Sequence, residues 1–399
     1  MLDSSPRESV GAFGSSSRAI AQISIFIAIL ASLAVLTEGL SWLYLSLAKS
    51  VDPMARHSFF TNQPWAVDYW EEVYSSATKE YHPYVVWRRA PFHGRYIQID
   101  GEGRRRTLNP SCNEHAPKIW MFGPSTLWGT GARDSDAIPS IVSSEYARSM
   151  GPVCVLNLGQ EGWSTTQGII EVELMLKRGE HPDLVIVYGG SNDVGTVFQY
   201  GALDSHLELP QVRSVFMDGK ALQTGFAYLR KTNTYRAASA IMEILDSVGK
   251  QNAPRIGSKP LVQKNWDGLA KTVYSTYEGN WRLLRALSKE YDFKIAGFWS
   301  PSIWTGNKPL APAERLLREM QRESTPGIVE LYTKSYDLVF GAGRPNLFSL
   351  ADVFDGIGDD LYFDHFHVAP PANRLIGVAI VEKLRKSGIV PLRQRADLP

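Results

Sequence analysis

The chain has 399 residues, of which 44% are hydrophobic and 21% charged, and its formal net charge at pH 7 is +1. A net charge so close to zero excludes a protein that binds nucleic acid through a strongly basic surface. The length is sufficient for one large domain with an appendage, or for two modest domains. The two cysteines, Cys112 and Cys154, are too few for a disulfide scaffold or a cysteine zinc site.

The N-terminal part predicts a disordered tail followed by a membrane anchor. Residues 1–18 are rich in Ser and Gly, which is typical of a disordered segment. From Ala19 to Thr37 the chain is apolar and contains no charged residue, and about 20 such residues span the core of a bilayer. Glu38 interrupts this run, but further apolar and aromatic residues extend the expected anchor over residues 19–48.

Two alternatives to an anchor fit this stretch less well. A signal peptide would have a shorter apolar region, and a buried helix of a soluble domain would keep a polar face. Arg7 and Arg18 precede the span, while Lys49 and Arg56 follow it, so the positive-inside count is a tie. We expect a single-pass anchor in the cell membrane, with the C-terminal part outside the cytoplasm.

Residues 49–115 are rich in aromatic residues, proline and arginine, and predict a spacer that packs on the main domain. Strand-like pieces occur at Tyr84–Trp87 and Tyr96–Ile99, and the second of them ends at an Asp-Gly turn. Arg104–Arg106 forms the largest basic cluster of the chain. Because charge runs usually face the solvent, we expect this cluster to be an exposed turn.

From Lys118 onward, short apolar runs alternate with segments of helical period, which predicts an α/β domain over residues 116–390. Strands that alternate with helices form right-handed βαβ units, so we expect a parallel sheet of about five strands. Residues 196–260 lack clear periodicity and are too long for a normal connection, which indicates an insertion that could cover the site. The expected strands are 119–122, 153–158, 184–188, 294–299 and 347–350, and the expected helices are 137–150, 166–178, 269–291, 313–323, 329–340 and 373–387.

Ser125 lies in a glycine-flanked turn, Phe122–Gly129, directly after the first expected strand. The carboxyl ends of parallel strands meet at one edge of an open sheet, where ligands and catalytic groups collect. Taken alone, this serine could equally cap the helix that follows. The turn is not a phosphate-binding loop, because no Lys-Ser or Lys-Thr pair follows it.

Four further residues are expected at the same edge of the sheet. Gly162 follows the second strand, Asn192 follows the third, and Asp364 and His367 precede the last helix. Each of them alone has an ordinary explanation as a turn glycine, a helix cap or a surface pair. Their occurrence in order, each at a strand end or before the last helix, predicts one shared site with Ser125.

The chemistry of these residues is that of nucleophilic catalysis. A serine needs a base within hydrogen-bonding reach, and His367 can supply it. Asp364 can hold the imidazole in one tautomer and stabilise its charged form. The backbone N–H groups of Ser125 and Gly162, with the side-chain amide of Asn192, can form an oxyanion hole.

Other candidates for these roles are less well placed. His365 could act as the base, but the three-residue spacing from Asp364 favours His367. Asp352 and Asp355 could orient the imidazole in place of Asp364. The HExxH, CxxC and EF-hand patterns are absent from the sequence, so we expect no metal and no cofactor.

The ordered set resembles the SGNH (GDSL-like) hydrolase superfamily, whose four marker blocks carry Ser, Gly, Asn and His. By this resemblance, Ser125 is the nucleophile, and Gly162 and Asn192 are the oxyanion donors of the second and third blocks. Asp364 and His367 match the Asp-x-x-His of the last block. The resemblance covers about residues 118–390 and implies a flavodoxin-like, three-layer α/β/α fold, no metal, and hydrolysis or transfer of acyl esters.

The expected fold bears on whether the two cysteines can form a disulfide. Cys112 lies just before the first strand, and Cys154 opens the second. The two strands are neighbours in a flavodoxin-like order, so a disulfide can form if the compartment is oxidising. Two buried thiols are the alternative.

The sequence thus predicts a membrane-anchored serine esterase that hydrolyses a carbohydrate- or lipid-linked acyl ester. An O-acyltransferase on a cell-envelope glycan would use the same site. A catalytically silent binding or assembly protein is a further alternative, supported by Pro124, which stands where the family usually has Asp before the serine. The sequence does not indicate the oligomeric state.

Overall fold

The chain folds as two units. One combines residues 1–50 with residues 215–251, and the other combines residues 51–214 with residues 252–399. The expected spacer and the expected main domain therefore fall in the same unit, whereas the middle of the expected insertion falls in the unit of the anchor. The computed structural model describes residues 13–48, 57–201 and 265–389, together with some residues between 205 and 241.

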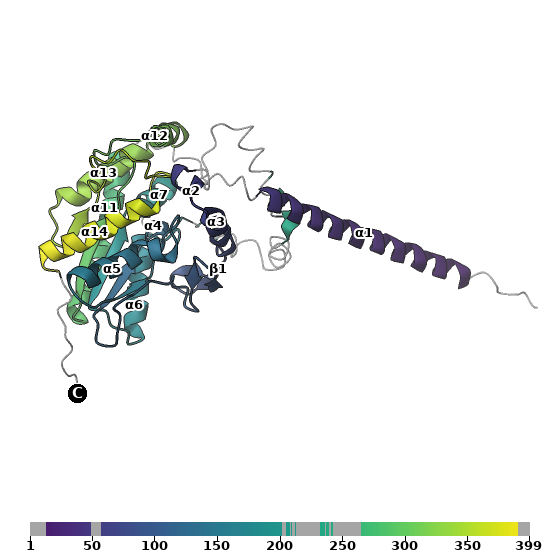
Figure 1. Ribbon diagram of the computed structural model, residues 1–399, viewed down its shortest axis with the longest axis horizontal. Coiled ribbons are helices and arrows are strands. Elements are labelled where there is room, and N and C mark those ends of the chain that lie inside the picture. Colours follow the sequence, from purple (N-terminus) through teal and green to yellow (C-terminus); the bar gives the residue numbers. More distant parts are fainter. Residues whose placement is uncertain are drawn as a thin grey trace, which may run out of the picture. The chain divides into compact units, whose positions relative to one another are not determined.

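Helix α1 (Phe13–Ala48) dominates the described part of the first unit (Figure 1). Among the described residues, it is the one helix that is long and apolar enough to cross a membrane, over Ser24–Ser46. Membrane anchors and signal sequences share these properties. The expectation of a disordered tail over residues 1–18 is wrong for residues 13–18, because extending a helix that has already formed costs little free energy. Residues 1–12 lie outside the described part.

Glu38 interrupts the apolar surface of α1 and is hydrogen-bonded within the same unit. Its carboxylate accepts the backbone N–H groups of Asn233 (2.5 Å) and Thr234 (2.9 Å), and the hydroxyl of Thr234 (2.8 Å). Asn233 and Thr234 open a helical turn, so the carboxylate binds backbone donors that the start of a helix leaves unpaired. This contact links the middle of the expected insertion to α1.

The insertion expected over residues 196–260 begins later than predicted. Residues 196–200 continue helix α7 (Ser191–Tyr200), which ends at Gly201 in the left-handed conformation. Gly195, inside this helix, weakens the helical pattern in the sequence. The expectation that the insertion covers the site concerns residues that lie mostly outside the described part.

The second unit is built on a parallel sheet of five strands, in the order β6-β5-β7-β8-β9. Numbered along the chain, these strands stand in the order 2-1-3-4-5, which is the flavodoxin-like order. The prediction of a flavodoxin-like α/β fold is therefore confirmed. The strands are β5 (Lys118–Phe122), β6 (Cys154–Asn157), β7 (Leu184–Gly189), β8 (Lys294–Trp299) and β9 (Leu347–Ser349).

Helices cover both faces of this sheet, as the alternation of side chains along the strands requires. In β5, Ile119 and Met121 pack on the face covered by α5 and α14, while Trp120 and Phe122 pack on the face covered by α6 and α11. Figure 1 shows α5 and α14 side by side. The helices are α4 (Ser125–Trp128), α5 (Ile138–Ser149), α6 (Thr165–Lys177), α11 (Trp266–Glu290), α12 (Pro312–Ser324), α13 (Ile328–Gly341) and α14 (Pro370–Ser387).

The spacer packs on the main domain through aromatic side chains. Tyr69 and Trp70 lie on a helix that the sequence pattern does not predict, and they are buried with Phe60 and with Phe363 of the main domain. The strand expected at Tyr84–Trp87 is displaced, since its first two residues form a turn. The elements are α2 (Ser58–Thr61), α3 (Ala66–Ser75), β1 (Lys79–His82), β2 (Val86–Arg89), β3 (Phe92–His93) and β4 (Gln98–Ile99).

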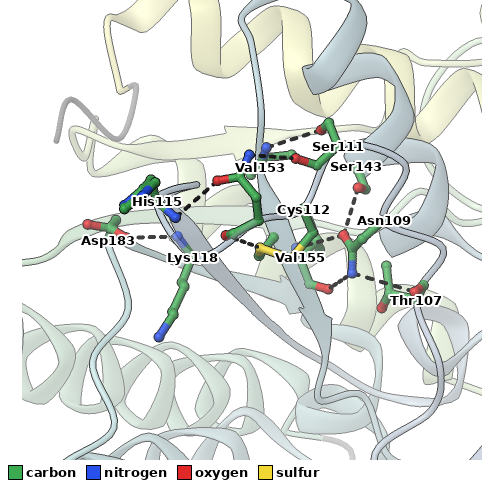
Figure 2. The surroundings of a disulfide bond; sticks show 12 residues. Thr107, Asn109, Ser111, Cys112, His115, Lys118, Ser143, Val153, Val155 and Asp183 are labelled. Carbon is green, nitrogen blue, oxygen red and sulfur yellow. Dashed lines mark hydrogen bonds between the residues drawn. A yellow bond between two sulfur atoms is a disulfide. The ribbon is translucent and has the colours of Figure 1, made fainter. Parts of the chain in front are cut away.

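A disulfide joins Cys112 to Cys154, with their Cα atoms 4.7 Å apart (Figure 2). Asn109 supports the same junction, because its amide group donates to the carbonyl of Val155 (2.9 Å) and accepts from the N–H of Val155 (2.9 Å). Its Oδ1 also accepts the hydroxyl of Ser143 (2.7 Å). The segment before β5 is thus fixed to the edge strand β6 by covalent and polar contacts.

The disulfide leads to a prediction about stability. The bridge spans a sequence separation of 42 residues, for which the loss of chain entropy in the unfolded state corresponds to about 4 kcal/mol. We expect the double variant Cys112→Ser with Cys154→Ser to have a free energy of unfolding lower by up to about this amount. Urea unfolding of the full chain in detergent, followed by tryptophan fluorescence, measures the change. Equal midpoints for the variant and the oxidised wild type would contradict the prediction.

Candidate active site

A serine, a histidine and a carboxylate meet at the carboxyl edge of the sheet. Ser125 opens the short helix α4 directly after β5, where Pro124 caps the turn by accepting two backbone N–H groups through its carbonyl. The hydroxyl of Ser125 lies 2.8 Å from Nε2 of His367, although 242 positions separate the two residues in the chain. Nδ1 of His367 lies 2.6 Å from Oδ2 of Asp364. These contacts have the geometry of a catalytic triad.

Asp364 is fixed by its own loop as well as by the imidazole. Its Oδ1 accepts the backbone N–H groups of Phe366 (2.9 Å) and His367 (2.7 Å). Burial alone would raise the pKa of Asp364, but the positive charge of His367 and these hydrogen bonds hold it well below its ordinary value. The carboxylate therefore stays ionised at neutral pH.

The same pair makes the imidazole more basic. Burial alone would lower the pKa of His367, but the charge and hydrogen bond of Asp364 outweigh burial, and the pKa is raised. The ring of Phe363 stacks on the imidazole, with centroids 5.8 Å apart and an angle of 13° between the planes. The imidazole is thus held in one orientation, with Nε2 directed at the serine hydroxyl.

The oxyanion loop, which we define as residues 158–163, follows β6 and carries Gly162. Gly162 has a φ of +77°, a backbone conformation that glycine adopts at little cost. Within the part of the chain that the structure describes, the N–H groups of Gly162 and Ser125 have no hydrogen-bond acceptor. Both donors are therefore available to a negatively charged oxygen.

Asn192 is attached to the oxyanion loop by its side chain. Its Nδ2 donates to the carbonyl of Trp163 at 2.8 Å. An amide nitrogen carries two hydrogens, so this bond orients the group and leaves the second N–H for another acceptor. The carboxyl group of the next residue, Asp193, accepts the N–H (3.0 Å) and hydroxyl (2.7 Å) of Thr165. Burial raises the pKa of Asp193 to about 6.

Direct contacts hold the oxyanion loop against the turn of the nucleophile. The N–H of Gln160 donates to the carbonyl of Gly123 (3.0 Å), and Nδ2 of Asn157 donates to the carbonyl of Trp128 (3.2 Å). A Cβ atom at Gly159 would lie 2.6 Å from the backbone nitrogen of Trp128, so this approach requires glycine. The segment around Gly162 thus holds the turn of Ser125 in place.

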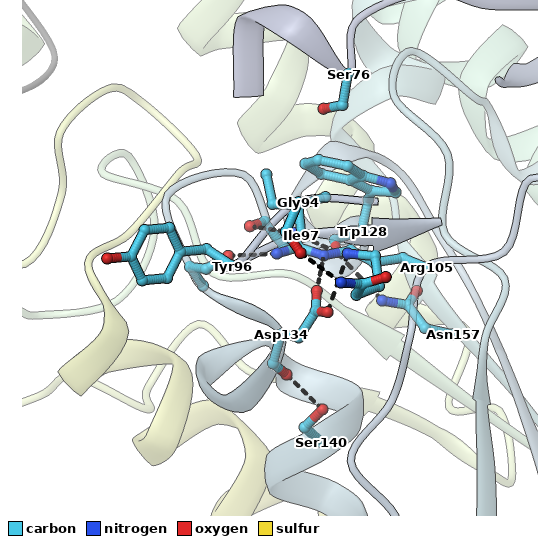
Figure 3. A network of polar contacts seen from close by, with 12 residues as sticks. Ser76, Gly94, Tyr96, Ile97, Arg105, Trp128, Asp134, Ser140 and Asn157 are labelled. Carbon is cyan, nitrogen blue, oxygen red and sulfur yellow. Dashed lines mark hydrogen bonds and ion pairs between the residues drawn. The ribbon is translucent and has the colours of Figure 1, made fainter. Parts of the chain in front are cut away.

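Arg105 supports the nucleophile turn from below and corrects the expectation of an exposed basic turn over Arg104–Arg106. Its side chain is fully buried, and it donates to the carbonyls of Trp128 (3.1 Å), Gly129 (2.8 Å) and Ala132 (2.6 Å) (Figure 3). Its Nε also pairs with Asp134 at 2.9 Å. The arginine is buried because the turn supplies a carbonyl or carboxylate acceptor for each of these donors.

The alternative candidates make other contacts. The ring of His365 stacks on Trp304, with centroids 5.6 Å apart, and burial lowers its pKa. Asp352 lies 4.0 Å from the ammonium group of Lys383, and Asp355 accepts the N–H of Asn307 (2.7 Å). Ser125, His367 and Asp364 therefore contact one another in a line. Asn192 binds the carbonyl of the residue that follows Gly162, and the alternatives take no part in these contacts.

The sequence pattern did not indicate Glu161, which belongs to the oxyanion loop, or Arg89 and Thr130, which contact its side chain. Glu161 accepts the hydroxyl of Thr130 (3.1 Å) and forms an ion pair with Arg89. The position of Glu161 next to Gly162 was a signal in the sequence, but nothing in the pattern pointed to Arg89. Among the described residues, no group of three His, Cys, Asp or Glu side chains could hold a metal ion.

No protein-family model and no curated protein matches the chain. Among solved structures, a lipolytic protein of the G-D-S-L family from Veillonella parvula DSM 2008 is 14% identical, with a TM-score of 0.36 over 68% of this chain and 100% of its own. A carbohydrate acetylesterase family member from Sinorhizobium meliloti is 13% identical (TM-score 0.34, 69% and 100%). An acetyl xylan esterase is also 13% identical (TM-score 0.34, 67% and 99%). Similarities at these TM-scores carry no information about the function of this chain.

Asp364 is expected to control the basicity of His367. In Asp364→Asn the imidazole loses the neighbouring negative charge, so its pKa should fall. An NMR titration of the imidazole nitrogens measures the change. Asp360→Asn is the matched control, since Asp360 pairs with His57 (3.3 Å) and Ser58 (2.6 Å) instead. An unchanged pKa in Asp364→Asn, or an equal fall in both variants, would contradict this assignment.

The raised pKa of His367 also makes the free energy of unfolding depend on pH. Because the pKa of His367 is raised in the folded protein, the pair stabilises the fold below the pKa of an unfolded histidine. This contribution is lost as the pH rises through the folded-state pKa. It should be absent in Asp364→Asn.

Proposed function

We propose that this protein is a membrane-anchored serine esterase of the SGNH (GDSL-like) type. The observation that carries the proposal is the continuous line of contacts from the Ser125 hydroxyl through His367 to Asp364. The ordered blocks of the sequence and the flavodoxin-like sheet support it. Gly162 follows β6 and Asn192 follows β7, the two strands that flank β5, and Ser125 follows β5 itself.

The chemistry follows from the geometry of the triad. Nε2 of His367 takes the proton of the Ser125 hydroxyl as the serine oxygen attacks the carbonyl carbon of the ester. The carbonyl oxygen becomes negatively charged, and the N–H groups of Ser125 and Gly162 and the amide of Asn192 donate to it. Asp364 stabilises the imidazolium during this step.

The second half of the reaction reverses the proton transfers. The imidazolium gives its proton to the oxygen of the departing alcohol, and an acyl group remains on Ser125. A water molecule then loses a proton to His367 and attacks the acyl carbonyl. The carboxylic acid leaves, and the serine hydroxyl recovers its proton. Attack by a sugar hydroxyl in place of water would transfer the acyl group and make the protein an O-acyltransferase.

The apolar helix α1 and the disulfide both support a reaction that takes place at the outer side of a membrane. Ser24–Ser46 has the length and composition of a membrane span, and disulfides persist in oxidising compartments outside the cytosol. We therefore propose acyl esters on envelope carbohydrates as the substrate class, with lipid esters as the second candidate. A catalytically silent binding protein is disfavoured, because such a protein would not need the serine–histidine contact.

The nucleophile provides the first test. Ser125→Ala should lower turnover of 4-nitrophenyl acetate by about 10⁴- to 10⁶-fold, since no other group can form the acyl intermediate. The measurement uses the full chain in detergent, together with labelling by a fluorophosphonate probe. The wild type should be labelled and the variant should not. Equal turnover in both proteins, or an unlabelled wild type, would overturn the proposal.

The oxyanion hole provides the second test. Asn192→Ala removes one donor that acts only as charge develops, so kcat should fall by about 10²- to 10³-fold with KM little changed. Asn280→Ala is the control. Asn280 is a buried amide of α11 that donates to Thr166 (2.9 Å). A similar loss of kcat in both variants would remove Asn192 from the site.

A further inference from the structure

The spacer strand β2 contacts the oxyanion loop through three hydrogen bonds. The indole N–H of Trp87 donates to the carbonyl of Glu161 (3.0 Å), and the indole N–H of Trp163 donates to the carbonyl of Trp87 (3.0 Å). The backbone N–H of Arg89 donates to Oε1 of Gln160 (2.9 Å). The path of the loop is therefore set by a strand that lies outside the blocks of the expected hydrolase domain.

The side chain of Glu161 extends this connection to the nucleophile. One carboxylate oxygen forms the ion pair with Arg89, and the other accepts the hydroxyl of Thr130 (3.1 Å). The backbone N–H of Thr130 donates in turn to the carbonyl of Ser125 (3.1 Å). Glu161 thus joins the turn of Ser125 to the loop of Gly162, which carry the two backbone donors of the oxyanion hole.

Arg89 is held rigidly on the opposite side. Only 1% of the residue is exposed, its guanidinium lies 4.1 Å from the centroid of the Trp128 ring, and its Nη1 donates to the hydroxyl of Ser76 (2.8 Å). The guanidinium of Arg105 also lies against Trp128, at 4.3 Å. A buried, stacked arginine keeps one position, so it offers a fixed point for the carboxylate of Glu161.

We propose that Glu161 and Arg89 are positioning residues, which keep the N–H groups of Ser125 and Gly162 directed at the same oxygen of the substrate. This inference rests on the proposed esterase function. Oxyanion donors act only when they point to the place where charge develops, and a misplacement of about 1 Å costs roughly 10²-fold in rate. The pair therefore acts on the transition state through the donors and need not contact the substrate.

The charge of Glu161 gives the proposal a second readout. Its carboxylate adds to that of Asp364 in raising the pKa of His367. Loss of this charge should lower that pKa and move the acid limb of the activity profile to lower pH. A purely structural defect would not move the limb in this way. The charged and titratable groups that face this region are Asp364 and His365 on the loop of His367, Glu161 on the oxyanion loop, and Arg89 and Lys79 on the spacer hairpin.

The neighbouring ion pair on the same strand supplies a matched control. Arg88 precedes Arg89 on β2 and pairs with Glu171 of α6 at 2.6 Å, and this pair is also buried. It joins the spacer to α6, and none of its hydrogen bonds involves the oxyanion loop. Removing either partner should lower stability through an unpaired buried charge, without changing the donors.

The experiment compares Glu161→Gln and Arg89→Gln with Glu171→Gln and Arg88→Gln. In the full chain with 4-nitrophenyl acetate, the first two should lose about 10- to 100-fold in kcat with KM little changed. Glu161→Gln should also move the acid limb to lower pH. The control variants should keep the kcat and pH profile of the wild type while unfolding at lower urea concentration.

Thr130→Val, which keeps the size of the side chain, tests the link if a charge variant does not fold. It should lower kcat without moving the acid limb. The positioning role would be overturned if Glu161→Gln kept the kcat and pH profile of the wild type, or if Thr130→Val kept the wild-type kcat. An equal loss of kcat in the control variants would overturn it as well. If Ser125→Ala is inactive at the same time, the esterase proposal stands and only this inference fails. Activity in Ser125→Ala would remove both.

Discussion

The structure depends on one short contact between two distant parts of the chain, the 2.8 Å approach of the Ser125 hydroxyl to Nε2 of His367. A parallel sheet makes it possible, because the chain returns to the same edge after every strand. The last helix completes it, since α14 packs beside α5 and brings the loop that precedes it over the end of β5. The contact of Ser125 with His367 therefore depends on topology as much as on residue type.

The sequence was sufficient to predict the sheet and the contacts among Ser125, His367 and Asp364, for a physical reason. Strands buried on both faces are continuous apolar runs, as in Leu184–Gly189, and amphipathic helices such as α11 repeat their apolar residues with helical period. Such patterns can be recognised in one sequence, because they depend only on residues that are close together along the chain. The positions of the five candidate residues could be predicted because each follows a strand or precedes a helix, and the strands of a parallel sheet end at one edge.

The contribution of the spacer could not be predicted in the same way. Arginines are rarely buried, so the pattern around Arg105 indicated an exposed turn, and nothing distinguished Arg89 from its neighbour. Their burial depends on acceptors that lie far along the chain, in the turn of Trp128 and in the oxyanion loop. A residue whose partners are distant in sequence carries no local signature. The spacer consequently contacts the loop of Gly162 directly, although its sequence resembles that of a connector.

The hydrogen bonds of Glu38 bear on how the protein can be produced in soluble form. Removal of the N-terminal helix would also remove the group that binds the backbone of Asn233 and Thr234. The truncated chain would then present an uncapped helix start to the solvent. A secreted or recombinant version should therefore omit both segments of this unit together, with a short linker replacing the second.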